Sequence, residues 1–595
     1  MKKNMLFLLV VLVVTPMMFL LASCENRIIP EIQADDVAVE FDGKSHGITA
    51  KLSVAGGLTY EYIGIDNSYR SSIGPIQPGD YKVKISYTPD SLSKIKSACK
   101  EVNLRIILPY TVSADISEIS AYSGVLKDIV IPTEYKGKSI TSIAVGTFAG
   151  KTIETVKFPV TSFNVNPVAF SGCESIKTFY ISANTVLLDG TYPNDIDIVF
   201  YDSPAIIKDD QFGVAIGIDK LEIPQSVIVL EQSSLSRICA NTLVLPSHLP
   251  LNTVNLSEEI KQVTVYNGGK SENRLPDDFF KNCSNVEKIE IQQGLLSFGN
   301  RIFENCTALD ELTIYSSIQS VGESLFSNCN LRKLEFDLSF SLQNIELPIT
   351  LKDIVISDGV TQVPDSSFYE CEYVERILLP ETIEHIGSYA FYGCKRLTSI
   401  TLPQQLTVVE YYTFAKCTFL SEIVLPEMIS EIKDGAFSDC ISLTSIALPI
   451  GLTQISPNLF VGCKSLQSVN IPNGVQSIGS SAFGQCSQLK EVVLPNSLVN
   501  IGYCAFEFCV NLEELTIPLN VNQIGEHVFL RCDSLMVLTI LSETMPIING
   551  NIFSDLPVGC SISVRQNLLP LYNLDYPEVN FVGIIWKRAW RFVVL

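Results

Sequence analysis

The side chains best able to do chemistry in this 595-residue chain are its histidines, cysteines and tyrosines. Histidine is scarce, since only His46, His248, His385 and His527 occur, which leaves few groups for general-base catalysis or metal binding at neutral pH. The sequence lacks the His-Glu-x-x-His and Gly-x-Ser-x-Gly patterns, a phosphate loop and a dinucleotide-binding glycine pattern. We therefore expect no enzymatic activity, no metal site and no cofactor.

The cysteines follow a period of 23 residues. The most regular ones are Cys371, Cys394, Cys417, Cys440, Cys463, Cys486, Cys509 and Cys532. The step from Cys329 to Cys371 is 42 residues, so one repeat has lost four residues. An even number of cysteines besides Cys24 would suit disulfides in an exported chain. Because twelve cysteines share one slot of the repeat, we expect instead a column of free cysteines that pack in the core as small hydrophobic residues.

Six tyrosines form the candidate partner-binding surface. They are Tyr369, Tyr373, Tyr389, Tyr392, Tyr411 and Tyr412. Tyr369 and Tyr392 are 23 residues apart, as are Tyr389 and Tyr412, so each pair should stack on neighbouring repeats. Tyrosine is favoured at recognition sites because it offers a large contact area at a small cost in conformational entropy. The alternative hypothesis is that these rings only cover the edge of the fold.

The 23-residue repeat indicates a chain of stacked coils, and these coils position the cysteines and tyrosines. Phenylalanines recur every 23 residues from Phe368 to Phe529, three residues before each cysteine of the run. Within each unit, a short apolar alternation predicts a strand, and a proline such as Pro449 ends it because proline cannot donate to a ladder. One coil cannot bury its apolar face alone, so the coils must stack.

The sequence therefore predicts a β-rich solenoid over residues 113–565, with one short parallel strand per 23-residue coil. Residues 174–270 carry few phenylalanine or cysteine landmarks, and the sequence does not define the coil boundaries there. Residues 25–112 alternate apolar and polar residues between glycine, proline and aspartate turns, which predicts a small β-sandwich before the solenoid. Residues 566–595 are expected to form a C-terminal cap and a tail, and residues 587–595 could dock on the cap or contact a membrane or a partner.

The repeat pattern resembles the BspA-like class of leucine-rich repeats. Ile478, Gly479, Ala482, Phe483 and Cys486 show the pattern in full. The resemblance implies a surface or secreted bacterial protein, often lipid-anchored, and several proteins of this class are adhesins for host matrix proteins or other microbes. We accordingly expect a non-enzymatic adhesin that binds protein ligands through the solenoid. The alternative hypothesis is a structural or accessory component of the cell envelope, for glycan capture or complex assembly.

Residues 1–24 have the features of an export signal. Two lysines precede an apolar run that ends in Leu21, Ala22, Ser23 and Cys24, which resembles the lipobox of bacterial lipoproteins. The resemblance implies cleavage before Cys24, lipid attachment to its thiol and a location at the outer membrane, exposed on the surface. A permanent membrane-spanning anchor is the alternative.

The net charge indicates which partners are excluded, and the N-terminal residues indicate a separate module. A formal charge of -22 opposes binding to nucleic acid and to anionic lipid headgroups, so a lipid at Cys24 would be the contact with the membrane. The run from Pro78 to Tyr87 resembles a strand of bacterial immunoglobulin-like modules, which implies a spacer role for residues 25–112.

Overall fold

The structure is a computed structural model that describes residues 30–42, 44–54, 56–65, 69–76, 79–89, 96–115, 117–269 and 273–584. The expected export signal, Cys24 and residues 587–595 lie outside this range. The chain divides into two compact units after Val263, and each unit is described by itself. Among the described residues, no helix has the length and apolar character needed to cross a membrane.

The N-terminal module consists of a five-stranded sheet and a two-stranded sheet. The strand order of the larger sheet is β2 (Val37–Glu40), β7 (Ala98–Ile107), β6 (Gly79–Tyr87), β4 (Thr59–Gly64) and β5 (Arg70–Ser71), and the smaller sheet pairs β1 (Ile32–Gln33) with β3 (Lys51–Leu52). In β6, Tyr81, Val83 and Ile85 are buried while Lys82 and Lys84 are exposed, as the alternation predicts. The spacer role remains a prediction.

Parallel coils follow in the same unit. One side of the coils carries β10 (Asp128–Val130), β14 (Thr155–Lys157), β16 (Thr178–Ile181), β18 (Gly190–Phe200), β20 (Ala215–Glu222) and β22 (Cys239–Pro246). A second sheet contains β17 (Thr185–Leu187), β15 (Phe163–Val165), β13 (Ser142–Ile143), β9 (Glu118–Tyr122) and β8 (Tyr110–Val112). Shorter pairs are β11 (Glu134–Tyr135) with β12 (Lys138–Ser139) and β19 (Ile206–Ile207) with β21 (Val229–Leu230). Here η1 (Pro167–Phe170) is a short 3-10 helix.

The structure supplies the coil boundaries that the sequence did not define in residues 174–270. Thr178 pairs with Asp197, Asp197 with Lys220 and Lys220 with Thr242, so coils of unequal length still stack in parallel. The strands β18 and β20 are long, and their buried Ile198 and Leu221 are paired strand positions, which later coils also fill with aliphatic residues such as Ile289.

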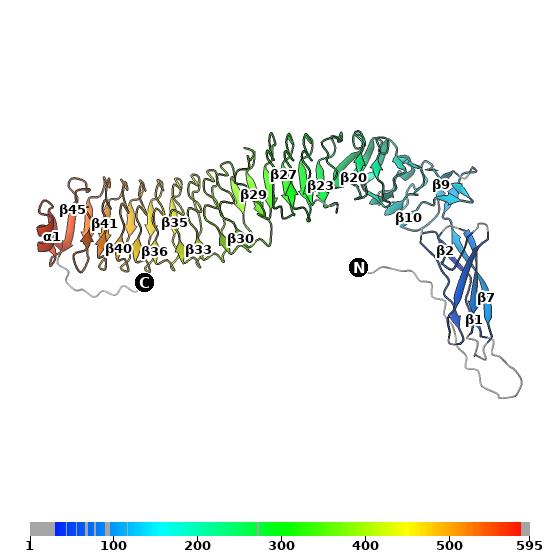
Figure 1. The fold of residues 1–595 in the computed structure, drawn as a ribbon, viewed down its shortest axis with the longest axis horizontal. Helices are drawn as coiled ribbons and strands as arrows, with labels where there is room; N and C mark the ends of the chain where they lie inside the picture. Colours follow the sequence, from blue (N-terminus) through cyan, green and yellow to red (C-terminus); the bar gives the residue numbers. More distant parts are fainter. Residues whose placement is uncertain are drawn as a thin grey trace, which may run out of the picture. The chain divides into compact units, whose positions relative to one another are not determined.

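The second unit is a regular solenoid of parallel coils (Figure 1). Its strands on the first side are β25 (Lys288–Ile291), β27 (Glu311–Ile314), β28 (Lys333–Phe336), β29 (Asp353–Ile356), β31 (Arg376–Leu378), β35 (Ser445–Ala447), β37 (Ser468–Asn470), β39 (Glu491–Val493), β41 (Glu514–Ile517), β43 (Val537–Ile540), β45 (Ser561–Arg565) and β46 (Phe581–Ile584). The predicted strand of each coil is thus confirmed, although the coils between β31 and β35 contribute only an isolated bridge between Thr401 and Val424.

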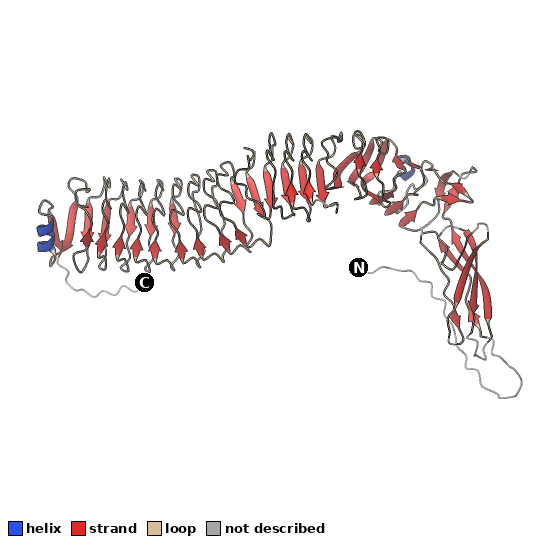
Figure 2. Ribbon diagram, viewed as in Figure 1, coloured by secondary structure: helices blue, strands red, loops and turns tan. Residues whose placement is uncertain are grey.

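A second, two-residue strand lies on another side of most of these coils. These strands are β24 (Arg274–Leu275), β26 (Ser297–Phe298), β30 (Gln362–Val363), β32 (His385–Ile386), β33 (Val408–Val409), β34 (Glu431–Ile432), β36 (Gln454–Ile455), β38 (Ser477–Ile478), β40 (Asn500–Ile501), β42 (Gln523–Ile524) and β44 (Ile547–Ile548). The strand β23 (Gln262–Tyr266) spans the division between the two units. Figure 2 shows that strand is the dominant regular structure.

Phenylalanines and cysteines form two buried columns in the second unit. From Phe368 to Phe506, successive rings stack with centroids 5.2 to 5.9 Å apart and planes within 3 to 20°. The Cys440 thiol donates to the carbonyl of Phe414 at 3.1 Å, and other cysteines repeat this bond one coil further on. All twelve cysteines of the repeat slot are buried and unpaired, which confirms their core position.

The third side of each coil, between the second strand and the cysteine, is called the turn side. In the coil of Phe368, the N–H groups of Ser366, Phe368 and Glu370 donate to carbonyls of the next coil at 3.0, 2.8 and 2.7 Å. The donors are thus every second residue. In each such coil, two residues have a left-handed backbone, for example Ser366 at φ 58° and Glu370 at φ 57°. The turn side is therefore a main-chain ladder with donors on one edge and acceptors on the other.

The last described segment covers the end of the array. The helix α1 (Leu569–Asp575) precedes β46, which pairs in parallel with β45. Tyr572 is fully buried, and Phe581 packs against both Tyr572 and Phe553 with ring centroids 5.2 and 5.1 Å apart. A terminal cover of this kind keeps the last apolar coil from solvent.

Candidate binding surface

Five of the six predicted tyrosines lie on the turn side of three consecutive coils, and the sixth, Tyr373, lies two residues after the cysteine that ends this side in its coil. The six residues are called the tyrosine patch. Tyr369 and Tyr392 stack with ring centroids 4.9 Å apart and planes at 7°, and Tyr389 and Tyr412 stack at 5.2 Å and 12°. Tyr389 also contacts Tyr392 at 5.8 Å, which joins the two pairs. The predicted stacking of both pairs is therefore confirmed.

The local backbone determines how the rings lie. Tyr389 and Tyr412 occupy the left-handed position of their coils, at φ 57° and 51°. The next coil has Gly435 in the same slot, at φ 63°, and a Cβ atom there would lie 2.3 Å from Cε1 of Tyr412. The ring of Tyr412 thus lies against a glycine backbone, which leaves no room for any other side chain.

Cations line the tyrosine patch. The Lys416 ammonium lies 5.1 Å from the ring centroid of Tyr392, the Arg396 guanidinium lies 5.6 Å from that of Tyr373, and Lys433 lies 5.8 Å from that of Tyr411. These distances allow cation–π attraction. Lys395 and Glu372 form an ion pair between two of these coils, with N and O 2.5 Å apart.

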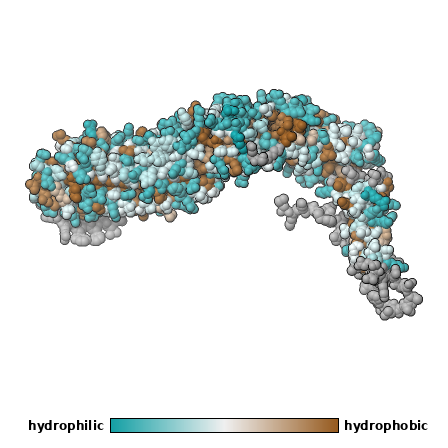
Figure 3. All heavy atoms as spheres, in the orientation of Figure 1, coloured by the Kyte–Doolittle hydropathy of each residue, from teal (hydrophilic) through white to brown (hydrophobic). Residues whose placement is uncertain are grey.

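Much of the tyrosine patch is accessible to solvent. The exposed fraction is 40% for Tyr373, 37% for Tyr389 and 43% for Tyr411, whereas the other three tyrosines are half-buried. The stacked rings thus cover the turn side of their coils and still offer ring faces and hydroxyl groups to a partner. Figure 3 shows a mixed surface over this unit, in which apolar residues are scattered among hydrophilic ones.

Burial and hydrogen bonding fix the protonation states of the tyrosine patch. Burial raises the pKa of Tyr412 above its ordinary value, and desolvation raises that of Tyr369. A hydrogen bond with Tyr392 raises the pKa of Lys416. At neutral pH, these two phenols therefore remain neutral donors and Lys416 remains a cation.

Sequence reasoning missed Phe419 and the cations of this surface. Phe419 is 60% exposed and occupies the slot that Tyr373 and Arg396 occupy in the two preceding coils. The signal was present, because Tyr373, Arg396 and Phe419 are each 23 residues apart. The same spacing argument could have placed Lys416, which occupies the repeat slot of Gly393 in the next coil.

A cavity of about 400 Å³ adjoins the tyrosine patch. Leu342, Ile345 and Leu347 of the shortened coil lie on one wall, and Tyr369, Glu370 and Tyr373 lie on the other. This cavity is called the groove. It lies beside the coil that has lost four residues, because that coil lacks the turn with the phenylalanine and the cysteine.

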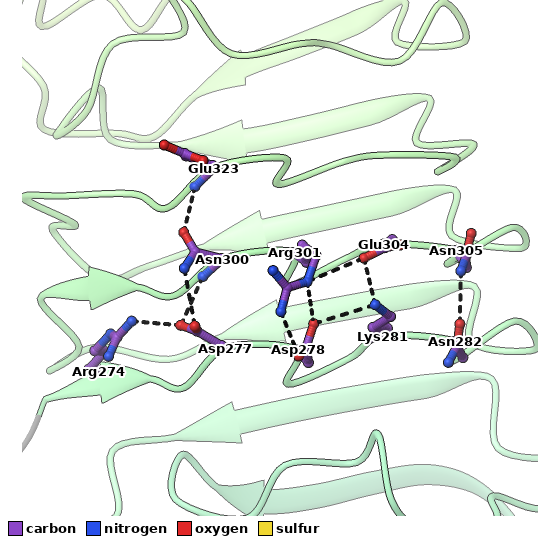
Figure 4. Close-up of polar contacts among 10 residues, drawn as sticks. All are labelled: Arg274, Asp277, Asp278, Lys281, Asn282, Asn300, Arg301, Glu304, Asn305 and Glu323. Atoms are coloured by element: carbon purple, nitrogen blue, oxygen red, sulfur yellow. Dashed lines mark hydrogen bonds and ion pairs between the residues drawn. The ribbon is translucent and has the colours of Figure 1, made fainter.

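Polar side chains occupy the turn side, and in Arg274 the adjoining second strand, of coils that precede the groove (Figure 4). The residues are Arg274, Asp277, Asp278, Lys281, Asn282, Asn300, Arg301, Glu304, Asn305 and Glu323. Arg301 donates two hydrogen bonds to Asp278 at 2.9 and 3.0 Å, and the Asn305 amide donates to Asn282 at 2.9 Å. These groups satisfy one another across neighbouring coils, so we interpret them as structural.

Metal chemistry finds no support in the described part of the chain, where no group of three or more histidine, cysteine or acidic residues is arranged to hold an ion. His527 follows Cys504 by one repeat period, and it contacts Asp555 with Nδ1 and Oδ2 3.1 Å apart. The neighbouring thiol of Cys504 has a pKa raised to about 11, chiefly by burial, so it is a poor nucleophile at neutral pH.

Comparison with known proteins identifies the repeat. Residues 114–234, 273–347, 346–467 and 453–569 match the family described as BspA type leucine rich repeat region. No curated protein matches the chain.

Solved structures of bacterial leucine-rich repeat proteins are similar to it. A leucine-rich repeat protein of T. pallidum is 32% identical over 31% of this chain and 77% of its own, with a TM-score of 0.25. A leucine-rich repeat protein of Bacteroides ovatus is 20% identical over 69% of this chain and 92% of its own, with a TM-score of 0.26. A leucine rich cell surface protein of Faecalibacterium prausnitzii is 18% identical over 74% and 94%, with a TM-score of 0.21.

Proposed function

The chain belongs to the BspA-type leucine-rich repeat family, and from that premise we propose that it is a non-enzymatic surface adhesin for protein ligands of a host or of other microbes. In this proposal, a lipid on Cys24 holds the protein at the outer membrane and the solenoid carries the binding surface. The family supports a role in protein interaction.

The observation that carries the proposal is the tyrosine patch. Exposed tyrosines with neighbouring cations are the side chains that dominate binding energy at protein interfaces. Stacking holds Tyr389 and Tyr412 in place before a partner arrives, so little side-chain entropy would be lost on binding. Further along the turn side, Tyr503 and Phe508 are also exposed and lie beside His527 and Arg531. Within the described residues, however, no other pair of tyrosines is stacked as Tyr369 with Tyr392 and Tyr389 with Tyr412 are.

A double substitution tests the role of the tyrosine patch. The purified chain and the Tyr389→Ser/Tyr412→Ser variant are titrated against immobilised host matrix proteins, mucins and polysaccharides. We expect the chain to bind at least one protein ligand and the variant to bind it at least tenfold more weakly, with an unchanged far-UV circular dichroism spectrum.

Tyr503→Ser is the matched control. Tyr503 is 50% exposed and shares the repeat slot of Tyr411, but it lies four coils from that residue. Its loss should leave binding unchanged. Equal binding by the double variant would contradict the proposal, and binding to polysaccharides alone would replace it with a glycan-capture role.

Anchoring is tested separately from binding. Cells that express the chain or its Cys24→Ala variant are labelled with a radioactive fatty acid, fractionated and treated with external protease. We expect label and outer-membrane recovery for the chain only, and protease digestion of intact cells should remove the solenoid. Label on the Cys24→Ala variant would contradict the lipid attachment.

A further inference from the structure

The main-chain ladder of the turn side is regular through most of the second unit. At every junction from the coil of Phe368 to the coil of Phe529, three N–H groups of one coil donate to three carbonyls of the next. The same holds for the two junctions from the coil of Phe280 to the coil of Phe326. A junction in this ladder is therefore complete when three bonds are present.

The shortened coil between Cys329 and Cys371 interrupts this ladder. Residues 338–351 form bends and turns, and they contain neither a second strand nor the turn that supplies ladder partners. On the following coil, the carbonyl of Ser367 accepts a bond from Leu342 N–H at 3.3 Å. The carbonyls of Asp365 and Tyr369, whose equivalents Ser388 and Tyr392 accept bonds from the preceding coil, receive none among the described residues.

The groove meets the open acceptor edge at Tyr369. Tyr369 and Glu370 form part of its wall, and the opposite wall is apolar, with Leu342 buried and Ile345 and Leu347 half-buried. Its volume of about 400 Å³ lies within the range of sites that hold small ligands or a few side chains of a peptide. An extended main chain is the ligand that supplies N–H donors to such an edge.

The charged residues of the groove determine which side chains a bound segment should carry. Glu370 forms no ion pair with the described residues, whereas the neighbouring Glu372 is bound by Lys395. The free carboxylate lines the groove together with Tyr369 and Tyr373, and the Arg396 guanidinium already lies 5.6 Å from the ring centroid of Tyr373. A basic side chain on the segment would therefore pair with the Glu370 carboxylate, and an adjacent apolar side chain would meet the leucine and isoleucine wall.

We propose that the groove binds an extended segment of a partner protein in which basic and apolar residues alternate, with a main-chain N–H group of the segment donating to the carbonyl of Tyr369. This inference rests on the proposed protein-binding role and assigns the chemistry of its partner. The segment adds the missing rung of the ladder, as a peptide does when it pairs with an open sheet edge.

The probe is a synthetic hexapeptide of alternating leucine and lysine, acetylated and amidated, titrated into the full chain by calorimetry. Two peptide controls isolate the two contributions. Replacing every lysine by glutamate should abolish binding, and N-methylation of the central leucine, which removes one main-chain donor, should weaken binding at least fivefold. Equal binding by the N-methylated peptide would overturn the role of the open carbonyl.

Protein variants locate the site. Glu370→Gln removes the free carboxylate with little change in shape and should weaken peptide binding at least fivefold. Asp439→Asn is the matched control, because Asp439 occupies the same slot three coils further on and shares the left-handed backbone at φ 57°. Leu347→Trp fills the groove and should abolish binding. Equal weakening by Glu370→Gln and Asp439→Asn would show a nonspecific charge effect and overturn the site.

The Tyr389→Ser/Tyr412→Ser variant separates this inference from the proposed function. Neither residue lines the groove, so this variant should keep peptide binding while it loses the protein ligand. If the chain binds a protein ligand through the tyrosines but binds no peptide, only the inference about the groove is contradicted. If it binds the peptide but no protein ligand, the proposed function is contradicted.

Discussion

Tyr389 and Tyr412 stack with their rings 5.2 Å apart although both residues have a left-handed backbone, at φ 57° and 51°. For a residue with a Cβ atom, this backbone costs about 1–2 kcal/mol relative to the right-handed one. Glycine avoids that cost, and the next coil has Gly435 at this position. The contact between the stacked rings must therefore offset the conformational cost of two left-handed residues. The orientation of the rings thus depends on the main-chain ladder that imposes this backbone.

Gly435→Ala should disturb this arrangement. The new Cβ atom would be strained at φ 63° and would lie 2.3 Å from the ring of Tyr412, so the ring must move. We expect a loss of at least about 1 kcal/mol in unfolding free energy, measured by urea denaturation, and weaker binding of the protein ligand. Gly484→Ala is the control, because Ala415 already occupies that slot. Normal ligand binding by Gly435→Ala would show that the position of Tyr412 is unimportant.

Phe437→Ala should leave a hole in the phenylalanine column. The ring is fully buried and stacks on Phe414 and Phe460 at 5.5 and 5.9 Å. Truncation of a buried phenylalanine costs about 3–5 kcal/mol, and in a solenoid the loss should be concentrated in the neighbouring coils. Hydrogen exchange measured by mass spectrometry should accelerate between residues 414 and 483 and stay unchanged beyond residue 540. Uniform acceleration along the array would argue against local coupling.

The buried cysteines should make the protein sensitive to alkaline pH. Burial raises the pKa of the thiols of Cys283, Cys371 and Cys532 to about 12. An exposed thiol in the unfolded chain has a pKa of about 8.5. The unfolded state therefore loses protons first, so the stabilisation is complete below about pH 8.5 and is lost as the pH rises toward 12.

Urea midpoints between pH 8 and 11 test this prediction. The midpoint should fall steadily above pH 9, and Cys371→Ala should reduce the slope because one titrating thiol is removed. Cys99→Ala is the control, since Cys99 is exposed. A stability that is constant up to pH 11 would contradict the buried protonated state of the column.

Asp353 should contribute to stability only while it is ionised. Arg376 donates to its carboxylate at 2.6 and 2.8 Å and Arg332 at 3.2 Å, and the bond from Arg376 is the main cause that lowers the pKa of Asp353. A lowered pKa means that the contribution is present above the ordinary value near 4 and is lost as the pH falls below it.

Asp353→Ala should thus lower the unfolding free energy by about 1.5–3 kcal/mol at pH 7, and this difference should shrink below pH 4. The control is Glu422→Ala on the same side of the solenoid, where Glu422 is exposed and forms no ion pair with the described residues. A difference between the chain and Asp353→Ala that does not depend on pH would show that packing, and not charge, stabilises this position.

The 23-residue period accounts for what could be predicted. Phe437 and Cys440 had to repeat in register because every coil makes the same contacts with its neighbours, so their burial followed from spacing alone. The same argument placed Tyr389 on Tyr412 and could have added Phe419. Residues 174–270 lack these landmarks, and their coils differ in length, because the paired positions Thr178, Asp197, Lys220 and Thr242 are 19, 23 and 22 residues apart.

The backbone features could not be read from the residues. Ser366, Glu370 and Tyr389 share the left-handed region, although only glycine, asparagine and aspartate favour it by type. Position in the ladder, and not residue type, imposes this conformation. The groove was missed for the same reason, because the four lost residues reveal a shorter coil but not which partners the neighbouring carbonyls lose.

The shortened coil also determines how the solenoid should respond to mechanical force. On the turn side, three bonds resist separation at each regular junction, whereas a single bond, from Leu342 to Ser367, joins residues 338–351 to the coil that follows. We expect traction along the array to open the turn side at this junction before the regular ones. The array would then lengthen at residues 338–351 before any tyrosine of the tyrosine patch was pulled out of place.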